Sequence, residues 1–129
     1  MTQTEKRERR RHTRFDINLD GNVRGIDPSE GTFQSDIEVL NISISGIYMK
    51  IHHYVDLFTK LELRMFLPVP DSRNDVVELD VNGVVVRVEP SKKKPDVKEY
   101  RIAIFFPNLN KLEKQRIQDF IKTLPPPPK

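Results

Sequence analysis

The sequence predicts an all-β domain, either a barrel or a sandwich, that is closed by one C-terminal α-helix. Six or seven short segments carry apolar residues at every second position, and turn-forming residues separate these segments at short intervals. A helical apolar spacing occurs only near the end of the chain. The length of 129 residues fits a single domain that is large enough to bury a core.

The first half of the chain contains three predicted strands. Residues 15–25 alternate apolar and polar side chains, which predicts one strand with a bulge at a glycine. The segment 27–31 holds Pro, Ser and Gly and predicts a turn. A second strand is expected over residues 32–40 and a short apolar one over residues 46–51.

The second half adds the remaining strands. Residues 60–67 and 100–106 each alternate as single strands. Residues 76–88 form the longest β-rich run, which Asn82 and Gly83 interrupt. Because this dipeptide favours positive φ, the run is either a tight hairpin or a continuous strand with a kink.

A helix is predicted over residues 110–124. Asn110 and Glu113 have the spacing of a capping box, in which each side chain bonds the other residue's backbone N–H. Residues 125–128 are all proline, which cannot continue a helix. The apolar stripe of this helix consists of Leu112, Ile117, Phe120, Ile121 and Leu124.

Charge is distributed unevenly along the chain. The net charge is +3, but residues 1–14 alone carry six cationic and two acidic side chains, so the remainder is close to neutral at −1. We predict a disordered basic arm over residues 1–8, a folded domain over residues 9–124 and a proline-rich tail over residues 125–129. An anionic partner is therefore expected at the arm.

Several classes of function are not expected. The chain has no cysteine, which excludes disulfides and zinc–thiolate sites. It has no apolar run long enough for a membrane span and no signal peptide, so we expect a cytoplasmic protein. The adjacent His52 and His53 would face opposite ways in a strand, which is poor geometry for a metal. No catalytic set of side chains is evident, so neither enzyme activity nor a cofactor is expected.

The basic segment contains two arginines, Arg10 and Arg14, at a spacing of four residues. A guanidinium group is planar and always charged, and it gives two parallel hydrogen bonds to a phosphate or to guanine O6 and N7. Arg9 lies beside this pair and adds a possible phosphate contact. Arg7 and Arg11 have the same spacing, so the register of the pair is open. A solvated tail remains the alternative.

A short polar run, "NISISG", follows the second predicted strand. Asn41 and Ser43 are two residues apart, so on a strand they point to the same side and both can meet one polar edge. Gly46 has no Cβ and allows a close approach of a ligand to the backbone. The alternative is a simple polar turn between two strands.

In this order and fold context, R-x-x-x-R (Arg10 to Arg14) followed by N-x-S-x-x-G (Asn41 to Gly46) resembles the PilZ family of cyclic di-GMP receptors. The resemblance also covers the strand series and the final strand and helix, and it implies a six-stranded antiparallel barrel with a C-terminal helix. It further implies that Arg10 and Arg14 bind phosphates and guanine faces, while Asn41 and Ser43 hold a guanine edge near Gly46.

This resemblance implies a binding module that takes cyclic di-GMP and needs no cofactor. The expected recipient of the signal is a separate, unidentified downstream protein, because 129 residues leave no room for an output domain. Two alternatives stay open: a domain of the same fold that binds proteins and no nucleotide, and a nucleic-acid-binding barrel with a basic arm. The nearly neutral body, which has no ladder of stacking aromatic residues, disfavours nucleic acid.

Overall fold

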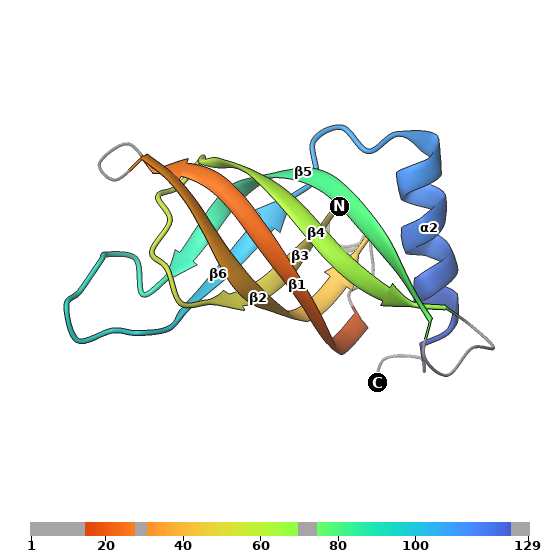
Figure 1. The fold of residues 1–129 in the computed structure, drawn as a ribbon, viewed down its shortest axis with the longest axis horizontal. Coiled ribbons are helices and arrows are strands. Elements are labelled where there is room, and N and C mark those ends of the chain that lie inside the picture. The colour runs from red at the N-terminus through yellow and green to blue at the C-terminus, as the bar shows by residue number, and fades with distance from the viewer. Residues whose placement is uncertain (1–14, 28–30, 70–74, 125–129) are drawn as a thin grey trace, which may run out of the picture.

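The chain forms a closed barrel of six antiparallel strands in the order β1-β2-β3-β6-β5-β4, with one helix lying across an end of the barrel (Figure 1). The computed structural model describes residues 15–27, 31–69 and 75–124. Its elements are β1 (Phe15–Asp27), β2 (Gly31–Ser43), β3 (Gly46–Ile51), β4 (Lys60–Pro68), β5 (Val76–Glu89), β6 (Tyr100–Phe105) and α2 (Lys111–Lys122). The predicted all-β fold is confirmed, and of the two architectures it is the barrel.

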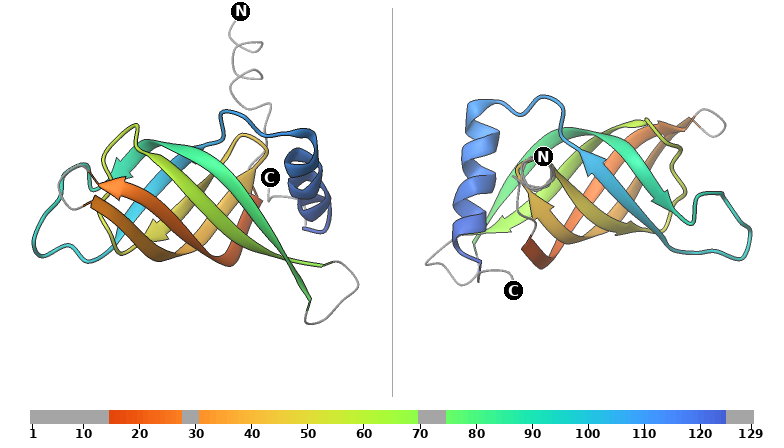
Figure 2. Two further views of the ribbon diagram at one scale, coloured as in Figure 1. Left: turned by 45° about the horizontal axis from the view of Figure 1, so that its top comes forward. Right: turned by 180° about the vertical axis from the view of Figure 1, so that it is seen from behind.

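The core fills the barrel and continues under the helix. The strands alternate buried and exposed residues, so that Leu61, Leu63 and Met65 of β4, for example, all point inward. Ile117 and Phe120 of α2 are buried at the end of the barrel, which the helix covers in both views of Figure 2. The fully buried larger side chains are Ile42, Ile47, Met49, Ile51, Leu61, Leu63, Met65, Ile102, Ile104, Ile117, Val23 and Val39.

Strand β5 is continuous, so the alternative of a hairpin at Asn82 and Gly83 is wrong. Both residues pair across to β4, where Asn82 lies opposite Glu62 and Gly83 opposite Leu61. Gly83 faces the core, and a Cβ at this position would lie 2.3 Å from Cγ2 of Ile104. The glycine therefore serves close packing inside the barrel and does not make a turn.

Strand β1 is longer than predicted and its bulge lies elsewhere. It runs to Asp27, and its register against β2 shifts between Asp16 and Leu19, not at either glycine. Gly21 and Gly25 are both in regular pairs with β2. At Gly21 a Cβ would lie 2.5 Å from the carbonyl oxygen of Arg64 on β4, so this glycine too allows a close approach between strands.

The predicted capping box begins α2. Asn110 Oδ1 accepts from the N–H of Glu113 at 2.7 Å, and the N–H of Asn110 donates to Glu113 Oε1 at 3.0 Å. The helix ends at Lys122, slightly before the predicted end. Leu112 was expected in the buried stripe but is 62% exposed, because it lies in the first turn on the side away from the barrel. The predicted arm (residues 1–8) and tail (residues 125–129) lie outside the described residues.

Replacing the cap tests how much α2 contributes to the fold. We expect Asn110→Ala to lower the free energy of unfolding by about 1 kcal/mol, because two backbone N–H groups lose their reciprocal partners. Urea denaturation followed by circular dichroism measures the change. Asn108→Ala, at an exposed position before the cap, is the control and should leave stability unchanged within about 0.5 kcal/mol. Equal stability of the two variants would contradict a stabilising role for the capping box.

Candidate functional site

The predicted site residues fall into two groups. Arg9, Arg10 and Arg14 lie outside the described residues, as do Arg7 and Arg11 of the alternative register. Asn41, Ser43 and Gly46 lie where β2 turns into β3, and the structure brings these three together. This turn is fixed to the last strand, since the N–H of Phe106 donates to the carbonyl oxygen of Ser45 at 2.9 Å.

Asn41 and Ser43 lie on the same side of strand β2, opposite to the inward-facing Ile42, but Ser43 is covered and only Asn41 is partly exposed. Ile42 between them is fully buried in the core, and the pairing is regular from Asn41 (opposite Tyr48) to Ser43 (opposite Gly46). The register shifts just before them, between Val39 and Asn41. In regular pairing every second residue of β2 after Val39 would face the core, and Asn41 would be the next of these. The register shift turns Asn41 outward instead.

Ser43 has a structural role within the turn. Its side chain is fully buried, and its Oγ lies 2.8 Å from Oγ of Ser45 and accepts from the N–H of Ser45 at 3.1 Å. The hydroxyl therefore stabilises the turn without any ligand. Sequence reasoning did not single out Ser45, although a serine two residues after another in a polar turn is a recognisable signal for such a bond.

Gly46 is needed by the barrel itself. A Cβ at this position would lie 2.0 Å from the carbonyl oxygen of Ile104 on β6, so any side chain would force the two strands apart. The missing Cβ thus already serves the pairing of β3 with β6, independently of any ligand.

Two residues near this turn were not found from the sequence. Tyr48 and Arg87 lie on the outer surface, where the Arg87 guanidinium carbon is 5.9 Å from the centre of the Tyr48 ring. The Tyr48 hydroxyl donates to Oε1 of Glu89 at 2.6 Å. Burial and this hydrogen bond to Glu89 raise the pKa of Tyr48 above its ordinary value.

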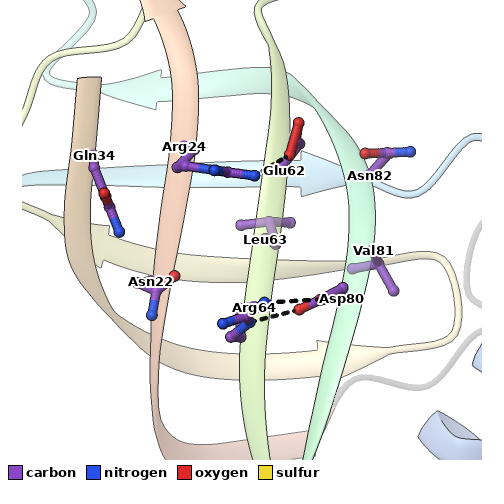
Figure 3. Close-up of a pocket in the computed structure, with 9 residues that line it drawn as sticks. All are labelled: Asn22, Arg24, Gln34, Glu62, Leu63, Arg64, Asp80, Val81 and Asn82. Atoms are coloured by element: carbon purple, nitrogen blue, oxygen red, sulfur yellow. Dashed lines mark hydrogen bonds and ion pairs between the residues drawn. The ribbon is translucent and has the colours of Figure 1, made fainter. Parts of the chain in front are cut away.

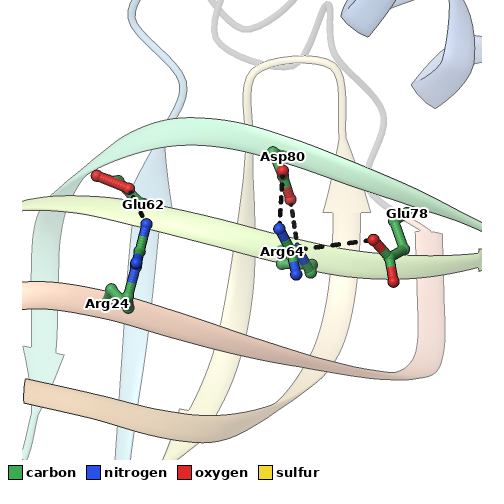
Figure 4. Close-up of polar contacts among 5 residues, drawn as sticks. All are labelled: Arg24, Glu62, Arg64, Glu78 and Asp80. Carbon is green, nitrogen blue, oxygen red and sulfur yellow. Dashed lines mark hydrogen bonds and ion pairs between the residues drawn. The ribbon is translucent and has the colours of Figure 1, made fainter.

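A polar depression of about 270 Å³ lies on another part of the barrel wall, across β2, β1, β4 and β5 (Figure 3). Its two arginines are already paired. Arg24 lies 2.8 Å from Glu62, and Arg64 bonds Asp80 through two nitrogens at 2.8 and 3.2 Å, with Glu78 at 3.9 Å (Figure 4). With its cations neutralised in this way, the depression is a poor site for an anion.

A larger groove of about 1070 Å³ lies at a rim of the barrel, between the end of β1 and the loop before β4. Ile26, Leu57 and Phe58 line it and are 51–73% exposed. Phe58 has a φ of 67° and is held by its N–H, which donates to the carbonyl oxygen of Val85 at 2.7 Å. This surface suits apolar side chains better than a charged ligand.

The described residues contain no group of three or more His, Asp or Glu side chains that could hold a metal ion. His53 stacks on Phe33 with ring centres 4.2 Å apart, and Nδ1 of His52 lies 3.0 Å from the carbonyl oxygen of Lys98. Both rings therefore have structural neighbours. In the described part of the chain, no helix is long and apolar enough to cross a membrane.

Comparison with known proteins finds a family model and several similar solved structures. The family model described as PilZ domain matches residues 8–123. The Bacillus subtilis inhibitor of motility (MotI/DgrA) has a similar structure, with a TM-score of 0.63 and 19% sequence identity over 89% of this chain. The PilZ domain with c-di-GMP of YcgR from Escherichia coli gives a TM-score of 0.58 and 15% identity over 90% of this chain.

The two structural matches differ in the share of the other protein's length that this chain covers. The chain spans 50% of the length of the motility inhibitor but 91% of the YcgR PilZ domain. At identities below 20% the two structures show a shared fold. A comparison with curated proteins found no match.

Removing the Ser43 hydroxyl tests its role in the turn. Ser43→Ala should lower the free energy of unfolding by about 0.5–1.5 kcal/mol without any ligand, because the Ser45 N–H loses its acceptor. Thermal or urea denaturation measures this. Ser35→Ala is the matched control on the same strand, since the Ser35 hydroxyl bonds only the neighbouring Asp36 carbonyl at the surface. If Ser43→Ala is as stable as Ser35→Ala, the turn does not depend on this bond.

The Arg64–Asp80 pair gives a prediction on pH. The hydrogen bond and charge of Arg64 lower the pKa of Asp80, so the pair stabilises the fold at neutral pH and this contribution is lost as pH falls through the lowered pKa. In Arg64→Ala the pKa of Asp80 should rise, which a carboxyl NMR titration measures. Arg116→Ala on α2 is the control and should leave this pKa unchanged; the pairing would be contradicted if Arg64→Ala did the same.

Proposed function

The chain belongs to the PilZ domain family, and from this premise we propose that it is a receptor module for cyclic di-GMP. The proposed site consists of Arg9, Arg10 and Arg14 from the basic arm and Asn41, Ser43 and Gly46 from the barrel wall. The arm binds phosphates and guanine faces, and the wall holds a guanine edge.

The observation that carries this proposal is the position of the N-x-S-x-x-G segment. It lies at the turn from β2 to β3, and a register shift turns Asn41 to the outer surface of the barrel. An amide on the outer wall can meet the donor and acceptor groups of a guanine edge. The segment is also within the part of the chain that matches the family, as are the arginines from Arg9 onward.

The energetics require several charged contacts. Fixing the backbone of an arm on binding costs roughly 1–2 kcal/mol for each residue that becomes ordered. A charge-assisted hydrogen bond contributes on the order of 1.5–3 kcal/mol, and bidentate arginine contacts to phosphate are among the strongest. Two or more arginines of the arm must therefore bind the ligand together, which is why the pair at a spacing of four residues matters.

The proposed output is a change of surface. With the ligand bound, the arm lies against the barrel wall and forms a surface that the free protein lacks. A separate downstream protein in the cytoplasm recognises this surface. No reaction is catalysed and no cofactor is used in this scheme, because ligand binding alone changes the population of the closed arm.

Single arginine variants test the site. We expect Arg14→Ala to abolish most of the binding of cyclic di-GMP, and Arg10→Ala to have much the same effect, because each removes charge-assisted contacts. Isothermal titration calorimetry measures the affinity. Arg7→Ala and Arg11→Ala are matched controls that remove one charge from the same arm and should bind nearly as wild type. A loss confined to these two would place the site in the other register.

The same titration separates the alternatives. GTP and a short oligonucleotide should give little or no heat with the wild-type protein. Binding of the oligonucleotide that weakens steeply with salt would instead support a nucleic-acid-binding barrel. The absence of any binding of cyclic di-GMP would overturn the proposed function and leave a protein-interaction domain of the same fold.

A further inference from the structure

A row of five residues crosses the outer wall of the barrel beside the turn that carries the N-x-S-x-x-G segment. Strand pairing places these residues directly opposite one another on neighbouring strands. In order across β1, β2, β3, β6 and β5, the row consists of Asp16, Asn41, Tyr48, Ala103 and Arg87. Since neighbouring strands lie about 4.8 Å apart, the row extends from Asn41 to Arg87 over roughly 14 Å.

Two register shifts create this row. On β2 the shift between Val39 and Asn41 puts Asn41 opposite Tyr48. On β5 the shift between Val85 and Arg87 puts Arg87 opposite Ala103, and Val86 is the extra residue. In regular pairing Arg87 would lie opposite the buried Ile102 and face the core, so the bulge turns a charged side chain outward.

The side chains within the row hold Arg87 in place. Ala103 is small and lies between Tyr48 and Arg87, which allows the guanidinium to lie 5.9 Å from the centre of the Tyr48 ring. The Tyr48 ring is fixed at its far end by the hydrogen bond from its hydroxyl to Glu89. Arg87 is thus stacked near an aromatic ring and forms no ion pair with any residue of the described part of the chain.

This differs from two arginines on another part of the barrel wall, Arg24 and Arg64. Arg24 and Arg64 are each bound to carboxylates (Figure 4), and an external anion would have to compete with them. Arg87 is exposed and its guanidinium is positioned by a ring rather than by a charge. Its capacity to bind two oxygens of an anion is therefore still available.

Resting on the proposed function, we propose that Arg87 is a further binding residue of the cyclic di-GMP site and contacts a phosphate, with Tyr48 as the residue that positions it. Cyclic di-GMP carries two phosphates on opposite sides of its ring. Arg87 provides a cation on the barrel wall beyond Tyr48, in addition to the arginines of the proposed function. The site then extends from β2 over β3 and β6 to β5.

Calorimetric titration of the full chain with cyclic di-GMP tests this. Arg87→Ala should weaken binding roughly 10- to 100-fold, the range for a lost charge-assisted hydrogen bond. Arg87→Lys should recover part of the affinity, because it keeps the charge for a phosphate. Arg64→Ala is the matched control, since it removes the same charge from an exposed arginine on another part of the wall and should bind as wild type.

The positioning role of Tyr48 is tested by a measurement of affinity that a purely structural role would not change in the same way. Tyr48→Ala should weaken binding about two- to fivefold in the wild-type protein but have no effect when Arg87→Ala is already present, because its role acts through Arg87. Tyr48→Phe keeps the ring and should bind as wild type within about twofold. Melting curves of each variant confirm that the barrel is folded.

The outcomes distinguish this inference from the proposed function. Loss of binding in Arg14→Ala together with unchanged binding in Arg87→Ala would overturn the inference and leave the proposed function intact. Equal weakening by Arg87→Lys and Arg87→Ala would overturn the phosphate contact. Additive effects of the Tyr48 and Arg87 substitutions would overturn the positioning role. A wild-type protein that does not bind the dinucleotide overturns both proposals.

Discussion

The closure of the barrel is the constraint on which the rest of this structure depends. Strand β1 pairs with both β2 and β4, so that the six strands form a ring without a free edge. Most apolar residues of each strand then face inward, and the strands must approach closely enough to pair on both sides. Gly21, Gly46 and Gly83 meet this demand, because at each of them a Cβ would collide with a neighbouring strand.

Closure also explains why the polar groups are where they are. A regular strand in a closed ring turns every second residue outward. Exchanging the inward and outward positions along the strand requires one extra residue, a β-bulge. The shifts next to Asn41 and Arg87 are such changes, and each leaves two consecutive residues between two inward apolar ones. Irregular pairing therefore supplies a polar surface on the wall without any loss of the core.

The turn between β2 and β3 gives two of the proposed binding residues a role in the fold. Ser43 bonds Ser45 within the turn, and Gly46 allows close pairing with β6. Both roles exist without a ligand. A ligand at this turn would meet a preformed and rigid surface, so the ordering cost of binding would fall mainly on the arm.

The sequence by itself determined the class of the fold, the strands and the capped helix, because local periodicity and capping depend on near neighbours in the chain. It also located Asn41, Ser43 and Gly46, which lie in one short segment. The tertiary structure alone decided that β5 is continuous, that Leu112 is exposed and that Tyr48 and Arg87 lie together, since each depends on contacts with elements far away in the sequence. At residues 39–42 and 85–88 the sequence itself shows that the alternation of apolar residues is interrupted by one extra residue. Only the strand pairing shows which residue is turned outward.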